Sequence, residues 1–403
     1  MSREMLAIPI KDQLDATMAR AAGSAAAPGA QAALMCNGER IWTGVHGLAR
    51  VDQSLPVSDE TPFCLASFGK LILAACTMHQ VERGVIGLDL PIAVYLGPGV
   101  PGADTVTVRM LLTHTAGFPD VYASPELSAL FPPELEASRS EVAAANPVRN
   151  NYDPDRPFTW SMFADALGSP VEAGEHWAYS NTGYIILARV LVQALGGDEE
   201  MERVCSQVIH SASGSRPMGD DLLTLRRSAR VAESLAHGYQ RLSDGLFHDT
   251  YLARRPTGVP VDLFGLPFGD GLFAGTAIGA AQFLDSLFIG GTLLDSELLQ
   301  EMVAATPQAM AGPAEPVRIN SYGMGTFRTQ VGSSVWQGHS GSYGGYTTMG
   351  ASEISAGFTL VVTTNGLPPF VEETSMNTVV TPACAVWNEL AAVCADYFAQ
   401  GDK

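Results

Sequence analysis

Two residues of this chain, Ser67 and Lys70, have the types and the spacing that covalent catalysis requires. If a helix begins at Ser67, the two side chains lie on one face with about 5–6 Å between their Cβ atoms, so the amine reaches the hydroxyl. This geometry places a nucleophile beside its base. A serine at a helix start is also a good N-cap, and the pattern S-x-x-K occurs by chance in many proteins, so other features of the chain have to decide.

The scarcity of lysine favours the catalytic interpretation. Lys and Arg together number 23, but only three of them are lysines: Lys11, Lys70 and Lys403. Arginine keeps its proton in proteins, whereas a desolvated lysine can release it. Residues 71–76 are apolar without interruption, which predicts a helix buried on all sides. A lysine at the head of such a helix must be paired or neutral.

Two further clusters contain polar residues that would complete such a site. Tyr179 and Asn181 precede an apolar helical pattern, and in an extended turn residues two apart point to the same side. A phenol beside an amine can relay protons, although Tyr179 packing in the core and Asn181 capping the helix is an equally good interpretation. The glycines of 337–346 would let a substrate backbone approach a sheet edge closely, and we expect His339 between them to face a cleft.

Composition restricts the partners and the location. The 403 residues are 46% hydrophobic and 16% charged, which is typical of a well-packed globular protein with two or three lobes. A net charge of −19 disfavours nucleic acid and anionic lipid as partners. The N-terminus carries a shorter apolar run than the about 7–15 residues of a secretory signal, and no stretch has the about 20 apolar residues of a membrane span. We therefore expect a soluble, cytoplasmic protein.

The six cysteines form no C-x-x-C pair, and in a reducing compartment they are expected to be buried thiols rather than disulfides or metal ligands. Cys64 lies three residues before Ser67 in a strand-like run and has no basic neighbour. This environment disfavours Cys64 as the nucleophile.

Apolar periodicity predicts strands near both chain ends and helices between them. An antiparallel sheet built from the two ends, with an inserted mostly helical lobe, is the simplest α+β packing. We expect residues 1–62 and 232–403 to form the sheet domain and 63–231 the helical domain, with the proline-rich segment 119–170 covering the substrate. Helices are predicted from Ser67 to before Gly84 and at 10–22, 107–114, 182–195, 276–288, 296–304 and 377–397; strands are predicted at 32–35, 41–45, 321–327, 335–338, 346–351 and 358–364, the first two forming a hairpin at Asn37-Gly38.

The three clusters, in this order and at these spacings, resemble the active-site elements of the penicillin-recognising serine enzymes. That superfamily contains class C β-lactamases, DD-peptidases, family VIII esterases, D-amino-acid amidases and transacylases. Residues 111–118 and 271–276 also resemble segments that recur in it, and the resemblance covers roughly residues 25 to 365. It implies a β-lactamase/DD-peptidase-like fold. The elements that carry it are Ser67-x-x-Lys70, Tyr179-Ser180-Asn181 and His339-Ser340-Gly341.

The resemblance also implies roles for individual residues, and it implies no metal and no organic cofactor. The acyl group would be carried by a serine, protons would be moved by an amine and a phenol, and the substrate would be held by an amide, a third wall and two backbone N–H groups. The residues concerned are Ser67 as nucleophile, Lys70 and Tyr179 as proton-transfer pair, Asn181, His339, Gly341 and Ser342 as substrate-binding residues, and the N–H groups of Ser67 and Ser342 as oxyanion hole.

We therefore expect a serine enzyme that transfers the acyl group of a small ester or amide to water or to an amine acceptor, as an esterase, amidase or transacylase. His339 stands where β-lactamases usually have lysine, so a fixed cation for the carboxylate of a β-lactam is missing. A DD-peptidase-like penicillin-binding enzyme or weak β-lactamase is the alternative. A non-catalytic binding or sensor module on the same fold is the alternative from another class.

Overall fold

The dominant feature of the computed structural model is an eight-stranded antiparallel sheet in the order β3-β2-β1-β13-β12-β11-β10-β9. Its strands come from the two ends of the chain, and β1 pairs with β13 where the ends meet. They are β1 (Gly29–Cys36), β2 (Glu39–Arg50), β3 (Leu55–Pro56), β9 (Arg318–Tyr322), β10 (Phe327–Val331), β11 (Ser334–Tyr343), β12 (Tyr346–Glu353) and β13 (Phe358–Thr364). The structure describes residues 3–25, 27–121, 160–211, 222–224, 234–241, 246–249, 273–309, 318–343, 345–367 and 381–401.

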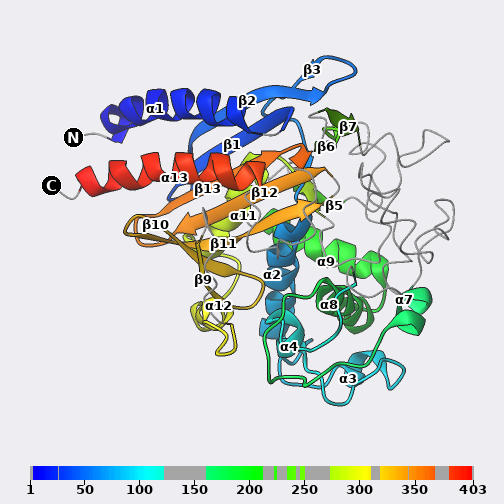
Figure 1. Cartoon of the computed structure of the whole chain (residues 1–403). Coiled ribbons are helices and arrows are strands. Elements are labelled where there is room, and N and C mark those ends of the chain that lie inside the picture. The colour runs from blue at the N-terminus through cyan, green and yellow to red at the C-terminus, as the bar shows by residue number, and fades with distance from the viewer. Residues whose placement is uncertain are drawn as a thin grey trace.

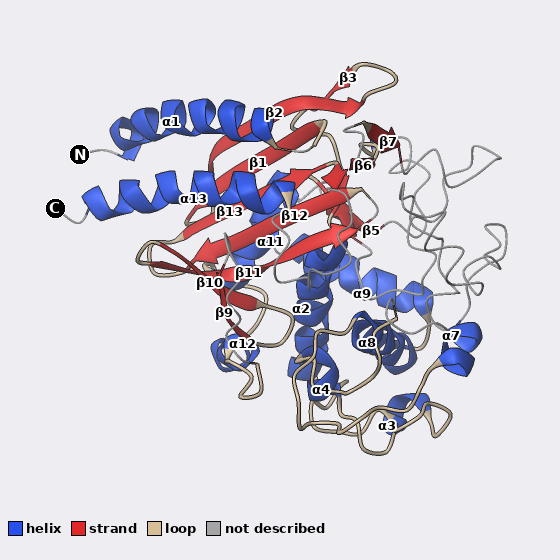
Figure 2. Ribbon diagram, viewed as in Figure 1, coloured by secondary structure: helices blue, strands red, loops and turns tan. Residues whose placement is uncertain are grey.

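Helices cover both faces of this sheet (Figures 1 and 2). The terminal helices α1 (Arg3–Ser24) and α13 (Pro382–Gly401) lie side by side on one face, where they contact each other and β2, β12 and β13. Helix α11 (Ala277–Phe288) packs on the opposite face against β1, β12 and β13. The sheet is therefore the middle layer of a helix–sheet–helix sandwich.

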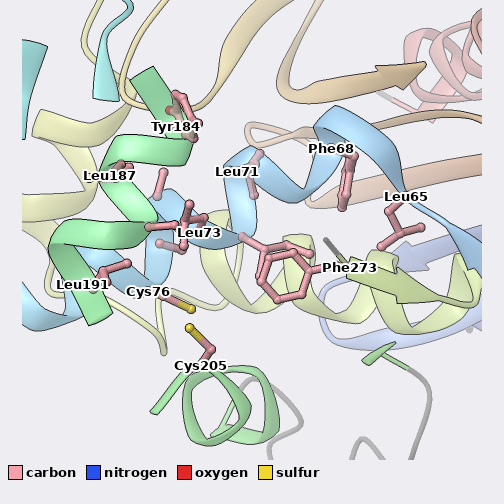
Figure 3. Packing of buried hydrophobic residues seen from close by; sticks show 14 of the residues in the cluster. Leu65, Phe68, Leu71, Leu73, Cys76, Tyr184, Leu187, Leu191, Cys205 and Phe273 are labelled. Carbon is pink, nitrogen blue, oxygen red and sulfur yellow. The ribbon is translucent and has the colours of Figure 1, made fainter. Parts of the chain in front are cut away.

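The remaining helices form a lobe beside α11. Its central helix, α2 (Gly69–Glu82), is buried from Gly69 to Met78, and α2 and α8 direct apolar side chains toward one another in Figure 3. One apolar core runs from this lobe to the inner face of the sheet, so the lobe is held firmly to it. The other helices of the lobe are α3 (Ala93–Leu96), α4 (Val108–Leu112), α7 (Trp160–Ala166), α8 (Asn181–Leu195), α9 (Asp198–Ser211) and α12 (Ser296–Val303).

Two small three-stranded sheets flank the main layers. The first joins the segment before the Ser67 turn to the segment before α11, and the second lies near the hairpin of β11 and β12. They consist of β4 (Phe63–Cys64), β8 (Phe273–Gly275) and β5 (Leu222–Thr224), and of β14 (Gly366–Leu367), β6 (Tyr239–Arg241) and β7 (Phe247–Asp249).

Several local predictions are confirmed. The hairpin turn Asn37-Gly38 has positive φ angles of 47° and 84° and joins paired residues Cys36 and Glu39, as expected for a type I′ turn. Strand β13 has the predicted bounds, and the predicted α+β fold is present. Of the six cysteines, five are buried and Cys36 is half-buried. Hydrogen bonding to Cys205 and burial raise the pKa of the Cys76 thiol well above its usual value.

Other predictions need correction. The predicted strand at 321–327 is wrong, because it spans the turn between β9 and β10, where Gly325 has a φ of 70°. Helix α13 begins at Pro382, and residues 377–380 of its predicted range lie outside the described residues, as do residues 122–159 of the segment expected to cover the substrate. The domain boundaries stay a prediction. Among the helices that the structure describes, none is long and apolar enough to cross a membrane.

Candidate active site

The candidate nucleophile, Ser67, lies in a single 3₁₀ turn, η1 (Ala66–Phe68), which leads directly into α2. Ala66 has a φ of 50°, an uncommon conformation for a residue with a Cβ atom and one that marks a constrained backbone. The Leu65 N–H donates to the Phe273 carbonyl at 2.9 Å, which fixes the entry to this turn. Ala66 and Phe68 are fully buried, whereas Ser67 is only half-buried, so the turn presents the serine to solvent.

The predicted contact between the serine and the lysine is present. Lys70 Nζ lies 3.0 Å from Ser67 Oγ and donates to Asn181 Oδ1 at 2.7 Å. An amide oxygen can only accept, so one hydrogen of the amine is directed at Asn181, and a neutral amine still has its lone pair to take the serine proton. The side chain of Lys70 is fully buried. Its nitrogen lies 5.2 Å and 5.8 Å from the ring centroids of Tyr179 and Tyr184, within the range of cation–π contacts.

The second predicted cluster converges on the same amine. Asn181 is the first residue of α8, and the cap of this helix is Ser180, whose hydroxyl accepts from the Gly183 N–H at 3.2 Å. The interpretation of Asn181 as the capping residue is therefore wrong, and its amide is directed to Lys70. The half-buried Tyr179 stacks its ring on His114 with a centroid distance of 4.3 Å.

Asp120 belongs to the site and was not predicted. Its Oδ2 accepts from the backbone N–H of Asn181 at 2.6 Å and from the side-chain Nδ2 of the same residue at 3.1 Å. The carboxylate thus holds the nitrogen side of the amide, which turns Oδ1 toward Lys70. An aspartate after a proline in a loop is ordinarily a turn residue, so the sequence carried no signal for this contact.

The strand of the third cluster, β11, meets the serine turn at Gly341. A Cβ atom on Gly341 would lie 2.3 Å from the Leu65 carbonyl oxygen and 2.9 Å from the Ser67 nitrogen. The absent side chain therefore makes room for the protein's own backbone, and not for a substrate backbone as expected. Pairing of β11 with β10 ends at Gly338, so residues 339–343 extend beyond β10 and pair with β12. Ser342 is exposed on this stretch, and its predicted oxyanion role stays a prediction.

The expectation that His339 faces a cleft is wrong. The residue is 2% exposed and both ring nitrogens have protein partners: Nδ1 contacts the Ser340 carbonyl and Nε2 lies 2.9 Å from the Tyr322 hydroxyl. Burial, reinforced by nearby Lys70, lowers the pKa of His339 to about 3, so the ring is neutral at neutral pH. A neutral ring with both nitrogens occupied supplies no cation to a substrate.

A second buried histidine, His114, was not predicted to belong to the site. Its Nδ1 accepts from the Ser180 N–H at 3.1 Å, and its Nε2 lies 3.0 Å from the Tyr322 hydroxyl. Burial, the nearby Lys70 and His339 hold the pKa of His114 well below its usual value. His114 lies in the segment 111–118 that carries part of the family resemblance, which was the available signal for it.

One group of side chains could hold a metal ion, counting only the residues that the structure describes. Asp52, His237 and Asp249 bring one ligand atom each to within 4.8 Å of one another. His237 Nδ1 already lies 2.7 Å from Asp249 Oδ2, so the two residues satisfy each other by a hydrogen bond. The three residues are separate from the contacts of Ser67 and Lys70 given above, and the chemistry of that pair does not involve them.

Comparison with known proteins agrees with this geometry. A family model described as Beta-lactamase matches residues 14–385. The chain belongs to the beta-lactamase family. Solved structures of the same fold include the D-amino acid amidase of Ochrobactrum anthropi SV3 with D-phenylalanine, at TM-score 0.73, 22% identity and 98% and 99% coverage of this chain and that one. A D-stereospecific amidohydrolase from Streptomyces has a TM-score of 0.66 at 20% identity, with 88% and 94% coverage.

Curated relatives of this beta-lactamase family chain match over shorter regions. A penicillin-binding protein of Bacillus subtilis is 28% identical over 159 residues, which are 40% of this chain and 31% of that protein. Esterase EstB of Burkholderia gladioli is 34% identical over 110 residues, 26% of this chain and 28% of the esterase. The match thus spans about a third of each relative. The family match over residues 14–385 and the shared fold thus agree in placing the protein in the β-lactamase-like superfamily.

The packing at Gly341 leads to a first prediction. Gly341→Ala places a methyl group against backbone atoms of the serine turn, which cannot move aside as a flexible side chain would. We expect a loss of about 1–3 kcal/mol in the free energy of unfolding, measured by urea denaturation, from overpacking. Gly99→Ala is the control, because a Cβ atom there meets open space. Equal stability of both variants would contradict the close packing of β11 on the turn.

The two buried histidines lead to a second prediction. The pKa of an unfolded histidine is about 6.5, and both folded values are lower, so the unfolded chain binds more protons below about pH 6.5. Their contribution to stability is complete above that pH and is lost as the pH falls, by up to roughly 1.4 kcal/mol per pH unit for each histidine. For His339 this loss continues down to its folded pKa of about 3. Urea unfolding between about pH 6.5 and 5.5, before most carboxylates titrate, measures this slope.

The two histidines contribute about equally to this slope of stability against pH, so His339→Gln should remove about half of their joint contribution. His176→Gln is the matched control, since the His176 side chain is 75% exposed. An unchanged slope in His339→Gln would show that His339 is not neutral in the folded protein.

Proposed function

We propose that the protein transfers the acyl group of a small ester or amide to water or to an amine, through an acyl-enzyme on Ser67. The observation that supports this best is the placement of one buried amine within 3.0 Å of the Ser67 hydroxyl and 2.7 Å of the Asn181 amide. A lysine with only a structural role would not require a half-exposed serine as its hydrogen-bond partner. A nucleophile has need of a base at this distance.

The steps of the reaction follow from these positions. Ser67 Oγ attacks the substrate carbonyl and gives its proton to neutral Lys70, with Tyr179 as the second member of the proton-transfer pair. The negative charge of the tetrahedral intermediate would be held by the N–H groups of Ser67 and Ser342. Collapse of the intermediate breaks the bond to the leaving alcohol or amine, which takes up the proton. Water or an acceptor amine then attacks the ester of Ser67 and loses its proton to the same base. The base passes this proton to the departing Ser67 oxygen, which regenerates the serine and the neutral amine.

The kind of substrate is proposed from the relatives and from the charge of the site. An esterase and D-amino acid amidases are among the similar proteins, which supports small esters and amides. The buried and neutral His339 offers no positive charge to a substrate carboxylate, which argues against efficient β-lactam hydrolysis. The cytoplasmic location stays a prediction from the sequence.

A penicillin-binding, DD-peptidase-like activity is the second candidate, favoured by the match to a penicillin-binding protein. Labelling of Ser67 by fluorescent penicillin, with release of D-alanine from a peptide ending in D-Ala-D-Ala, would support it. A non-catalytic module of the same fold would form no acyl-enzyme at all.

The proposal predicts a covalent adduct on Ser67 and a requirement for the Lys70 amine. Mass spectrometry after treatment with a fluorophosphonate should show one adduct on Ser67, absent in Ser67→Ala. Lys70→Arg keeps a positive charge but cannot accept a proton, so hydrolysis of p-nitrophenyl esters and D-amino acid amides should fall to background. Lys11→Arg, at an exposed position of α1, should keep full activity. Folded protein without an adduct, or an active Lys70→Arg variant, would refute the proposal.

Asp120 leads to a separate prediction about the rate of acylation. Asp120→Ala frees the Asn181 amide to rotate, so Oδ1 no longer holds the amine in place for the serine. We expect the rate of adduct formation to fall by about tenfold or more, the size of effect that a small misplacement causes. Asp104→Ala, at an exposed position of the same lobe, should react at the wild-type rate. Equal rates in the two variants would show that Asp120 does not orient the amide.

A further inference from the structure

A chain of hydrogen bonds links the helical lobe to strand β11 beside the candidate active site. It starts at the N–H of Ser180, passes through His114 and Tyr322, and ends at His339 and the carbonyl of Ser340. The successive distances are 3.1 Å from Ser180 N to His114 Nδ1, 3.0 Å from His114 Nε2 to Tyr322 Oη, and 2.9 Å from Tyr322 Oη to His339 Nε2, with His339 Nδ1 in contact with the Ser340 oxygen.

The two ends of this chain determine where every proton lies. The backbone N–H of Ser180 can only donate, so His114 Nδ1 accepts and the proton of this ring is on Nε2. The carbonyl of Ser340 can only accept, so the proton of His339 is on Nδ1, and Nε2 accepts the Tyr322 O–H. The phenol of Tyr322 thus accepts from one histidine and donates to the other. The two histidines are opposite tautomers, and all donors point in one direction.

This hydrogen-bond chain joins two segments that border the site: a first wall, which carries Tyr179 and Asn181, and a second wall, which carries Gly341 and Ser342. It meets each wall at a residue next to these. Ser180 lies between Tyr179 and Asn181, and Ser340 directly precedes Gly341 on β11. The backbone of the first wall is otherwise fastened within its own lobe, where Ala178 donates to the His114 carbonyl. The backbone of the second wall pairs with β12. Tyr322, at the end of β9, is 3% exposed and stands between the two imidazole rings.

We propose that Tyr322 is a positioning residue of the Ser67 centre, whose hydroxyl couples the wall carrying Tyr179 and Asn181 to the wall carrying Gly341 and Ser342. This proposal rests on the proposed acyl-transfer function. The single phenolic group sets the spacing between the two imidazole rings, and through them the spacing between the proton-transfer residues and the strand that would hold the oxyanion. Tyr322 itself does not touch the reacting atoms.

The hydrogen-bond chain requires both histidines to be neutral. An imidazolium at His114 would direct a second N–H at the Ser180 N–H, and one at His339 would direct an N–H at a phenol that already donates. The groups facing the chain are Lys70 from α2, Tyr184 from α8, and Tyr179 from the segment before α8, whose ring stacks on His114. Acid therefore breaks the chain at its histidines, and the coupling of the walls is lost with it.

Tyr322→Phe tests the proposal, because it removes one oxygen and keeps the ring. In the wild-type protein the Tyr322 hydroxyl donates to the lone pair of His339 Nε2, which stabilises the neutral ring. Without this donor the pKa of His339 rises. We expect kcat/KM for p-nitrophenyl acetate to fall by about tenfold or more, mostly in kcat, with the acidic limb of its pH profile displaced to higher pH. Packing alone would lower stability and leave the pH profile unchanged.

Tyr346→Phe is the matched control. Tyr346 lies on strand β12, and the change removes a similarly buried phenol, which donates to the Ala236 carbonyl at 2.6 Å. This variant should lose stability under urea as Tyr322→Phe does, but keep the wild-type kcat and pH profile. A Tyr322→Phe enzyme with the kcat and acidic limb of the control would overturn the proposal.

Histidine side-chain NMR tests the chain independently of any activity. In the wild-type protein at neutral pH, the ¹⁵N shifts should report the Nε2–H tautomer for His114 and the Nδ1–H tautomer for His339, assigned with His114→Gln and His339→Gln. Equal tautomers, or a charged ring at either position, would overturn the proposal even if Tyr322→Phe does not fold. Absence of a Ser67 adduct with the expected tautomers would instead refute the acyl-transfer function and leave the chain intact.

Discussion

The burial of one amine at the head of an apolar helix is the constraint on which the rest of the site depends. Lys70 is fully buried at the start of α2, and an amine in that place must have polar partners or lose its charge. Its partners are the Ser67 hydroxyl and the Asn181 amide, and the amide in turn is held by Asp120. This second contact fixes the amide, and the fixed amide helps to hold the flexible four-carbon side chain of Lys70 in one position.

The helical lobe that carries Lys70 packs against the sheet formed by the two chain ends, so the amine lies beside the sheet. The serine turn lies close against β11, and the missing side chain of Gly341 permits this contact. The chain ends supply the sheet, and the segment between them supplies the helices. The site therefore lies at the junction of segments far apart in sequence, since Lys70 and Asn181 are 111 residues apart.

The sequence predicted the parts of the site that depend on local spacing. The contact of Ser67 with Lys70 follows from helical periodicity, and the turn at Asn37-Gly38 from its two residue types. The contacts of Asp120 with Asn181 and of His114 with Tyr322 join residues 61 and 208 positions apart, and no periodic pattern records such pairs. The failed strand at 321–327 has the same origin, because strand-like residues continue through a turn that Gly325 makes possible.

The charges of the site also depend on one another. A positive charge at Lys70 lowers the proton affinity of both His114 and His339, and each of these groups lies where water cannot screen the others. Two neutral imidazoles beside one amine is the arrangement that avoids packing several cations into one buried volume. A lysine in place of His339 would bring a second amine into the same buried volume, where a second positive charge is costly. His339 is therefore part of one electrostatic arrangement with Lys70, in which its buried ring carries no charge at neutral pH.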